Sequence, residues 1–198
     1  MAVTPFEIIV DPFDVYVAAV GTSFPLVDGS LSAWTQLGTS GSKSFTEDGV
    51  VVTHSQTIDY HRSYGDTAPV KATRSSEDCT VAFTLMDLTI DHYNRIWENT
   101  VTSTAQSSGV AGIKDINIKK GLDVGVVAMI IRGASPYGDS WNTQYQIPKV
   151  VQSGSPSVTY SKSAPAGLSL EYTVISDLTA SPASISMGKI IMQYQAQG

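Results

Sequence analysis

The sequence predicts a mainly β protein, a β-sandwich or barrel with one flanking α-helix. Two runs, Val50–Ile58 and Cys79–Leu85, follow a period of two, which places successive side chains on opposite faces of a strand. Strand-like runs recur at intervals of about 8–15 residues, a spacing typical of sandwiches and barrels. One segment, residues 89–97, carries apolar side chains at helical spacing instead.

The first half of the chain begins with an extended arm, residues 1–13, in which two prolines flank an apolar run. A strand is predicted over Asp14–Val20, which is rich in β-branched residues. Glu47-Asp48-Gly49 is predicted to be a tight hairpin turn, because glycine tolerates a positive φ. Residues 59–69 are polar and are predicted to form a long loop between two strands.

The predicted helix has recognisable start signals. Thr89 is a suitable N-cap, and Asp91 lies in the first turn, where the helix dipole favours a negative charge. Tyr93, Ile96 and Trp97 form an apolar stripe. We therefore expect this helix to pack on a sheet face and close one side of the core.

The second half is predicted to consist of strands joined by turns and one flexible loop. Residues 102–112, rich in Ser, Gly and Ala, are predicted to be that loop, and Gly133–Ser140 a turn cluster. Pro148 cannot donate to a ladder, so we expect an edge or a bulge there. The predicted strands are Ile113–Ile118, Val124–Arg132, Trp141–Val151, Val158–Ser161, Leu168–Ile175 and Met187–Tyr194.

Composition indicates a single domain with a surface poor in charge. The 198 residues contain no strong repeat and no long linker, so we expect one domain over residues 1–198. Charged residues make up 15% of the chain, against roughly 25% in an average soluble domain. This favours a surface that meets other protein. The alternative is that abundant Ser and Thr keep the surface soluble.

Charge is unevenly distributed along the chain. Residues 1–99 contain 13 acids and 5 bases, a net −8, whereas residues 100–198 contain 5 acids and 7 bases, a net +2. The total of −6 argues against nucleic acid as a tightly bound partner, because neutralising phosphates requires Lys and Arg. Lys114, Lys119 and Lys120 form a small basic cluster, either a solvated face or a salt-bridge patch between subunits.

The sequence predicts no catalytic or metal-binding cluster. His54, His61 and His92 share no metal-ligand spacing with one another or with a cysteine. Cys79, the single cysteine, lies in an apolar run and is expected to be a buried hydrophobe. Adjacent acids such as Glu77-Asp78 point apart on a strand and make a poor acid–base pair. We expect no enzyme activity, no cofactor and no metal.

The chain is expected to be made and folded in a cytoplasm. Its first 14 residues lack the basic start of a signal peptide and contain Glu7 and Asp11. The longest apolar run, Val124–Ile131, is far shorter than the roughly 20 residues that cross a membrane. We therefore expect no membrane insertion.

A series of motifs occupies roughly the first 100 residues. In order they are D-V-Y-V-A-A-V-G-T-S-F-P (Asp14–Pro25), W-T-Q-L-G (Trp34–Gly38), F-T-E-D-G-V-V-V-T-H-S-Q (Phe45–Gln56), A-P-V-K-A (Ala68–Ala72) and S-E-D-C-T-V-A-F-T-L-M-D-L-T (Ser76–Thr89). In this order they resemble the core of a tailed-phage major tail protein, the tube protein of long non-contractile, siphovirus-type tails. The second half matches that family only in its general β character.

The resemblance implies a tail-tube fold, similar to that of type VI secretion tube proteins. It implies hexameric rings of identical subunits that stack into a hollow tube in the virion tail, assembled in the host cytoplasm. The implied partners are further copies of the chain, the tape measure protein, and the tail tip and tail terminator proteins. Viral DNA would pass through the lumen without specific binding, which an acidic or neutral lining suits.

Two segments are candidates for contacts between subunits, namely the arm at residues 1–13 and the loop at residues 59–69. We expect both segments to be flexible in the monomer, which would hold assembly back until a template orders them. The individual candidates are Phe6, Ile8, Tyr60, His61, Arg62, Tyr64 and Asp66.

Two alternative functions stay open from the sequence. One is a related structural role, as a tail terminator, a head-decoration protein or a secretion-tube subunit. The other is a carbohydrate-binding β-sandwich in which Trp34, Tyr137 and Trp141 form a sugar platform, although aromatic residues at such spacings more often belong to a core or an interface.

Overall fold

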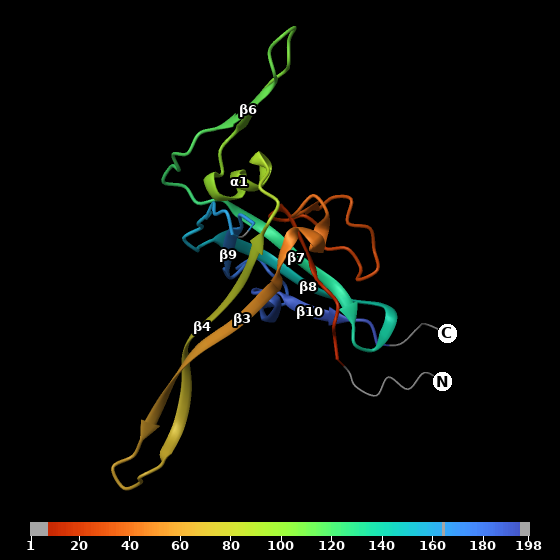
Figure 1. Cartoon of the computed structure of the whole chain (residues 1–198). Helices are drawn as coiled ribbons and strands as arrows, with labels where there is room; N and C mark the ends of the chain where they lie inside the picture. The colour runs from red at the N-terminus through yellow and green to blue at the C-terminus, as the bar shows by residue number, and fades with distance from the viewer. Residues whose placement is uncertain (1–7, 164, 195–198) are drawn as a thin grey trace.

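The described part of the chain is mainly β with antiparallel pairing and contains one α-helix, so the predicted fold class is confirmed (Figure 1). The computed structural model describes residues 8–163 and 165–194. The strands are β1 Asp14–Ala19, β2 Thr35–Gln36, β3 Phe45–Arg62, β4 Pro69–Leu85, β5 Val101–Thr104, β6 Ile113–Ile116, β7 Val126–Ser135, β8 Gly138–Gln152, β9 Leu168–Val174 and β10 Lys189–Met192; the helix is α1 Ile90–Trp97, with short 3-10 turns at Gly41–Ser44 and Ala183–Ile185.

One sheet of eight strands organises the molecule, in the order β2-β1-β7-β8-β9-β4-β3 with β10 also paired to β8. The long strand β8 is the branch point. Its Thr143–Gln146 stretch pairs with β10, and its Val150–Gln152 stretch pairs with β9. The strands β2 and β3 are the last in the path, so the outer edge of each carries unpaired backbone groups.

The core lies on one face of this sheet and is closed by α1. On β7, Met129 and Ile131 point into this core, whereas Ala128 and Ile130 form a smaller cluster with Trp34 on the other face. A strand covered on both faces reads as a continuous apolar run, which explains the run at residues 124–131. The other fully buried members of the main core include Val15, Val17, Leu37, Val81, Leu85, Val150, Leu168 and Leu170.

Helix α1 forms where it was predicted. The side chain of its N-cap Thr89 accepts a hydrogen bond from the backbone N–H of His92, and Asp91 lies in the first turn. Ile96 is buried in the main core, and Tyr93 and Trp97 pack against its edge. The predicted role of the helix, closing one side of the core, is therefore confirmed.

The predicted hairpin turn at Glu47-Asp48-Gly49 is wrong. The chain passes through these residues without reversing direction, as part of β3, and the ladder to β4 shifts register between Phe45 and Val50. Gly49 has a φ of 64°. Glycine with positive φ suits a β-bulge as well as a turn, and here the bulge bends one continuous strand.

The loop predicted at residues 59–69 is shorter than expected. Strand β3 continues to Arg62 and β4 begins at Pro69, so the connection is residues 63–68. These strand ends pair with each other and not with a core, so their polar sequences carry no hydrophobic alternation. Residues 102–104, predicted to be loop, are likewise strand, as part of the β5–β6 hairpin.

The predicted irregularity at Pro148 is confirmed as a bulge. Val150 pairs with Val127 and Ile147 pairs with Met129, so Pro148 and Lys149 together oppose the single residue Ala128. The predicted turn at Gly133–Ser140 is narrower than expected, because Ser135 already pairs with Gly138.

Candidate assembly surfaces

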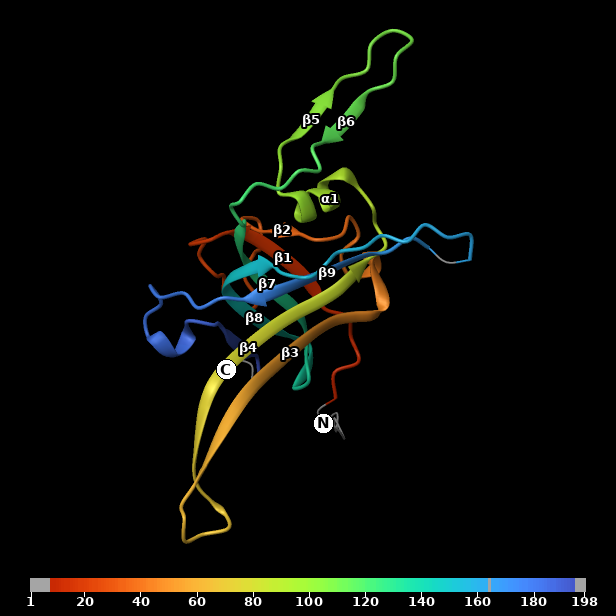
Figure 2. The same cartoon turned by 90° about the vertical axis from the view of Figure 1, so that its left-hand side faces the viewer.

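The most prominent feature is the β3–β4 hairpin, which projects far from the body (Figure 2). Strand β9 covers the outer edge of β4 only from Thr80 to Leu85. Beyond the pair Thr53–Thr80 no strand among the described residues pairs with either edge of the hairpin, over a length of about 30 Å at about 3.3 Å per residue. A two-stranded ribbon of this kind is marginally stable alone, and its free edges can pair with another chain.

The tip of the hairpin brings together five of the predicted contact residues. Tyr60, His61 and Arg62 end β3, and Tyr64 and Asp66 lie in the connecting loop. All five are exposed. Among the other two candidates, Ile8 is exposed and lies apart from the tip, beside the groove described below, and Phe6 lies outside the described residues.

The tip is shaped by its own hydrogen bonds. His61 Nε2 is 2.9 Å from Thr73 Oγ1 across the ladder, and the Arg62 guanidinium donates to the carbonyl of Thr67. The backbone N–H of Ala68 donates to Asp66 Oδ1 at 3.0 Å, an Asx turn. These bonds give the connecting loop, which carries Tyr64, a defined shape next to Tyr60 at the end of β3.

A charged cross-strand group lies midway along the hairpin. Glu77 accepts from His54 at 2.9 Å and from Arg74 at 3.3 Å. The hydrogen bond from His54, followed by the nearby Arg74 charge, lowers the pKa of the exposed Glu77 carboxyl. Cross-strand pairs of this kind help to hold the register where no core lies beneath the ribbon.

The hairpin also exposes several large apolar side chains. No residue from Thr53 to Asp78 is buried, so these side chains have no core of their own. Grouped exposed apolar side chains mark interaction surfaces. On this hairpin they are Val51, Ile58, Tyr60, Tyr64 and Val70.

A second hairpin, β5–β6, projects from the opposite end of the body (Figures 1 and 2). It lies next to α1, and Lys114 Nζ is 3.5 Å from Asp91 Oδ2 of that helix. Ile113 and Val110 are exposed on it. The two hairpins therefore give the molecule two ends, each with side chains available to a neighbour.

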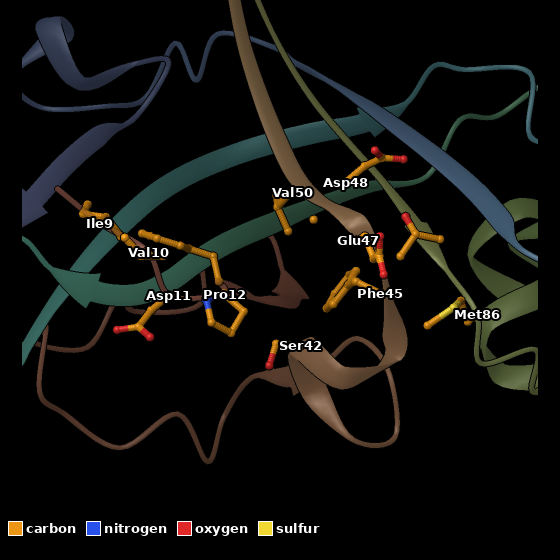
Figure 3. Close-up of a pocket in the computed structure, with 13 residues that line it drawn as sticks. Ile9, Val10, Asp11, Pro12, Ser42, Phe45, Glu47, Asp48, Val50 and Met86 are labelled. Carbon is orange, nitrogen blue, oxygen red and sulfur yellow. The ribbon is translucent and has the colours of Figure 1, made fainter.

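A groove of about 960 Å³ opens beside the start of β3 (Figure 3). Residues 9–13 form one wall, and the bulged part of β3 together with Met86 forms the other. Its apolar lining includes Ile9, Val10, Phe45 and Val50, and its carboxylates are Asp11, Glu47 and Asp48.

The histidines show no arrangement for catalysis. His54 and His61 make the exposed cross-strand bonds described above, and His92 is buried with both ring nitrogens bonded to neighbours. Within residues 8–163 and 165–194, no three His, Cys, Asp or Glu side chains are grouped so that they could hold a metal ion. No helix in the described part of the chain is long and apolar enough to cross a membrane.

One of the three aromatic residues of the hypothetical sugar platform, Trp34, is not at the surface. Trp34 is buried and its ring stacks on Phe24 at a centroid distance of 5.2 Å. Tyr137 is exposed, but Trp141 packs closely beneath Gly138. Trp34 therefore belongs to the smaller core cluster and offers no face to a ligand.

The acidic groove is the surface that the sequence did not predict. Its carboxylates come from the arm and from the segment taken to be a turn, and Met86 follows β4 directly. The adjacent acids Glu47-Asp48 were the available signal, but the tertiary fold alone brings the arm against them.

No protein-family model matches the chain, and no curated protein matches it.

Proposed function

We propose that this chain is a structural virion protein whose copies form stacked, hexameric rings, and that these rings make the hollow tail tube through which phage DNA is delivered. The observation that carries the proposal is the β3–β4 hairpin, a long ribbon with free edges, exposed apolar side chains and no core. Soluble monomers normally protect such edges, whereas a polymer covers them with its next subunit.

Three further observations support the proposal. Two hairpins project from opposite ends of the body, which suits contacts along a stack. The chain is poor in charged residues, which make up 15% of it. The motif order of the first 100 residues resembles the tube proteins of siphovirus-type tails. In this proposal the tape measure, tail tip and tail terminator proteins are partners, DNA crosses the lumen unbound, and the chain has no catalytic role.

The test is negative-stain electron microscopy of the concentrated, purified chain, alone and with tail tips from the same source. The expected result is hollow tubes of uniform diameter with six subunits in each ring. Caps on existing tubes without extension would indicate a tail terminator instead. Glycan binding by a monomer that never assembles would contradict the proposal.

A matched variant tests the role of the hairpin. Replacing residues 57–76 by Asn-Gly joins Gln56 to Glu77, which already face each other, through a two-residue turn. The core residues of β4 and the β9 pairing are retained. We expect a folded monomer that forms no tubes, and tubes of normal length from this variant would contradict the role assigned to the hairpin.

A further inference from the structure

The groove beside the start of β3 combines apolar walls with three exposed carboxylates. In the described part of the chain, Asp11, Glu47 and Asp48 take part in no ion pair, and no basic side chain lines the groove. Thr46 also lines it, and its buried hydroxyl oxygen has no hydrogen-bond partner. The groove therefore suits a partner that is both basic and apolar.

The shape of the site favours an extended partner. Strand β3 is the last strand of its sheet, and the bulge interrupts its ladder between Phe45 and Val50, so the groove lies beside an irregular edge. Val10 in the opposite wall is 87% exposed, and Met86 at one end of the groove is also exposed. An extended segment can lie along this groove and place its side chains between the two walls.

The chain carries a segment of the required chemistry at residues 117–124. Ile118 and Leu122 are 71% and 102% exposed, and Lys119 and Lys120 lie between them. The segment is irregular and is held at its start by Asn99, whose amide donates to the carbonyls of residues 117 and 119 at 2.6 and 3.0 Å. Its one carboxylate is Asp123, so the segment has a net charge of +1 and combines two adjacent lysines with exposed apolar side chains.

The segment does not reach the groove of its own chain. The connection from β6 to β7, which contains residues 117–124, lies well apart from the start of β3 in both views (Figures 1 and 2). Contact therefore requires two copies, and it joins two different surfaces of identical chains. Such heterologous contacts close rings or extend polymers.

We propose that residues 117–124 of one copy bind in the acidic groove of a second copy, with Lys119 and Lys120 facing Glu47 and Asp48. This inference rests on the proposed function, in which copies of the chain assemble into a tube. It names one contact that drives this self-association. The contact also places lysines from the basic second half of one copy next to carboxylates from the acidic first half of another.

Reciprocal charge reversal tests this contact. Two double variants are made, Glu47→Lys/Asp48→Lys and Lys119→Glu/Lys120→Glu, together with the chain that carries all four changes. Because like charges then face each other, each double variant should need about tenfold or more higher concentration to assemble, in sedimentation velocity and microscopy. An equimolar mixture of the two, and the fourfold variant, should assemble as the wild type does.

A control separates a local contact from an effect of net charge. Lys162→Glu/Lys189→Glu makes the same change in net charge as Lys119→Glu/Lys120→Glu at two other exposed positions and should leave assembly unchanged. Equal loss in this control, wild-type assembly by either double variant, or failure of the mixture to recover would overturn the proposal.

A second measurement keeps the contact testable should the wild-type chain stay monomeric. A labelled peptide of residues 115–125 is titrated into the full chain and followed by fluorescence anisotropy. It should bind the wild type, and both the Glu47→Lys/Asp48→Lys chain and a peptide with both lysines changed to glutamate should abolish binding. Peptide binding without tubes would retain the contact and refute the tube function. Absence of peptide binding, or tubes insensitive to charge reversal, would refute the contact.

Discussion

At the residue scale, His92 shows how one buried polar side chain joins distant segments. It is only 6% exposed, and its Nε2 accepts the backbone N–H of Gly38 at 3.0 Å. Its Nδ1 lies 2.8 Å from the carbonyl oxygen of Asp87, which can only accept, so Nδ1 carries the proton. The ring thereby ties helix α1 to the loop that precedes β3.

Replacing His92 should therefore be costly. His92→Phe fills similar space but leaves the Gly38 N–H and the Asp87 carbonyl without this partner, so the free energy of unfolding should fall by about 1–3 kcal/mol. The exposed His61→Ala is the control and should change it by less than about 0.5 kcal/mol. Urea denaturation of both variants measures the difference, and equal values would contradict the role given to His92.

Tyr172 gives a pH dependence at the same scale. Burial raises the pKa of its hydroxyl from 10 to about 12. The pKa of Tyr172 is higher in the folded than in the unfolded chain. The contribution of Tyr172 to the free energy of unfolding is therefore complete below pH 10 and is lost as pH rises toward 12. That loss is on the order of 2 kcal/mol. Tyr172→Phe should flatten the decline in unfolding free energy between pH 10 and 12, and an unchanged slope would count against this assignment.

At the element scale, β3 is a single strand only because of its bulge. Gly49 supplies the positive φ, and a Cβ built there would meet no atom within 4 Å. Glycine is therefore required at position 49 because of the backbone conformation and not because a side chain would clash with its neighbours. Without the bulge, the register that sends Val50 and Val52 toward the core would not continue from Phe45.

Gly49→Ala should consequently destabilise the chain by about 1 kcal/mol, because an L side chain disfavours this backbone region. Gly65→Ala is the matched control, since Gly65 also has open space around it but no positive φ. In thermal unfolding experiments, Gly49→Ala should have a lower midpoint temperature than the wild type, and Gly65→Ala should not. Similar midpoints would show that the bulge tolerates a side chain.

At the scale of the whole molecule, the buried contacts that stabilise the fold lie in the body, and the surfaces proposed for assembly lie on the projecting hairpins. Strands β7 and β8 are long, paired on both edges and bordered by buried side chains. The hairpin beyond Thr53 and Thr80 has only its own ladder. Such a division lets a monomer fold first and order its ribbons on a neighbour.

Amide hydrogen exchange measures this division directly. In the monomer, residues 54–79 should exchange much faster than the amides of β7 and β8, because local opening of the ribbon exposes no core. After assembly the same residues should become protected. Equal protection of hairpin and body in the monomer, or no gain on assembly, would contradict the proposed burial of the hairpin by a second copy.

Local chemistry in the sequence was sufficient to predict the β class, the helix with its Thr89 cap, and an edge or a bulge at Pro148. Alternation, capping and the missing proline N–H act within a few residues, so they are visible without the fold. The length of the hairpin, the continuity of β3 through Gly49 and the acidic groove were decided only by tertiary structure. Polar strands that pair with each other carry no hydrophobic pattern, a glycine suits a turn and a bulge equally, and the groove exists because residues 9–13 fold back against β3.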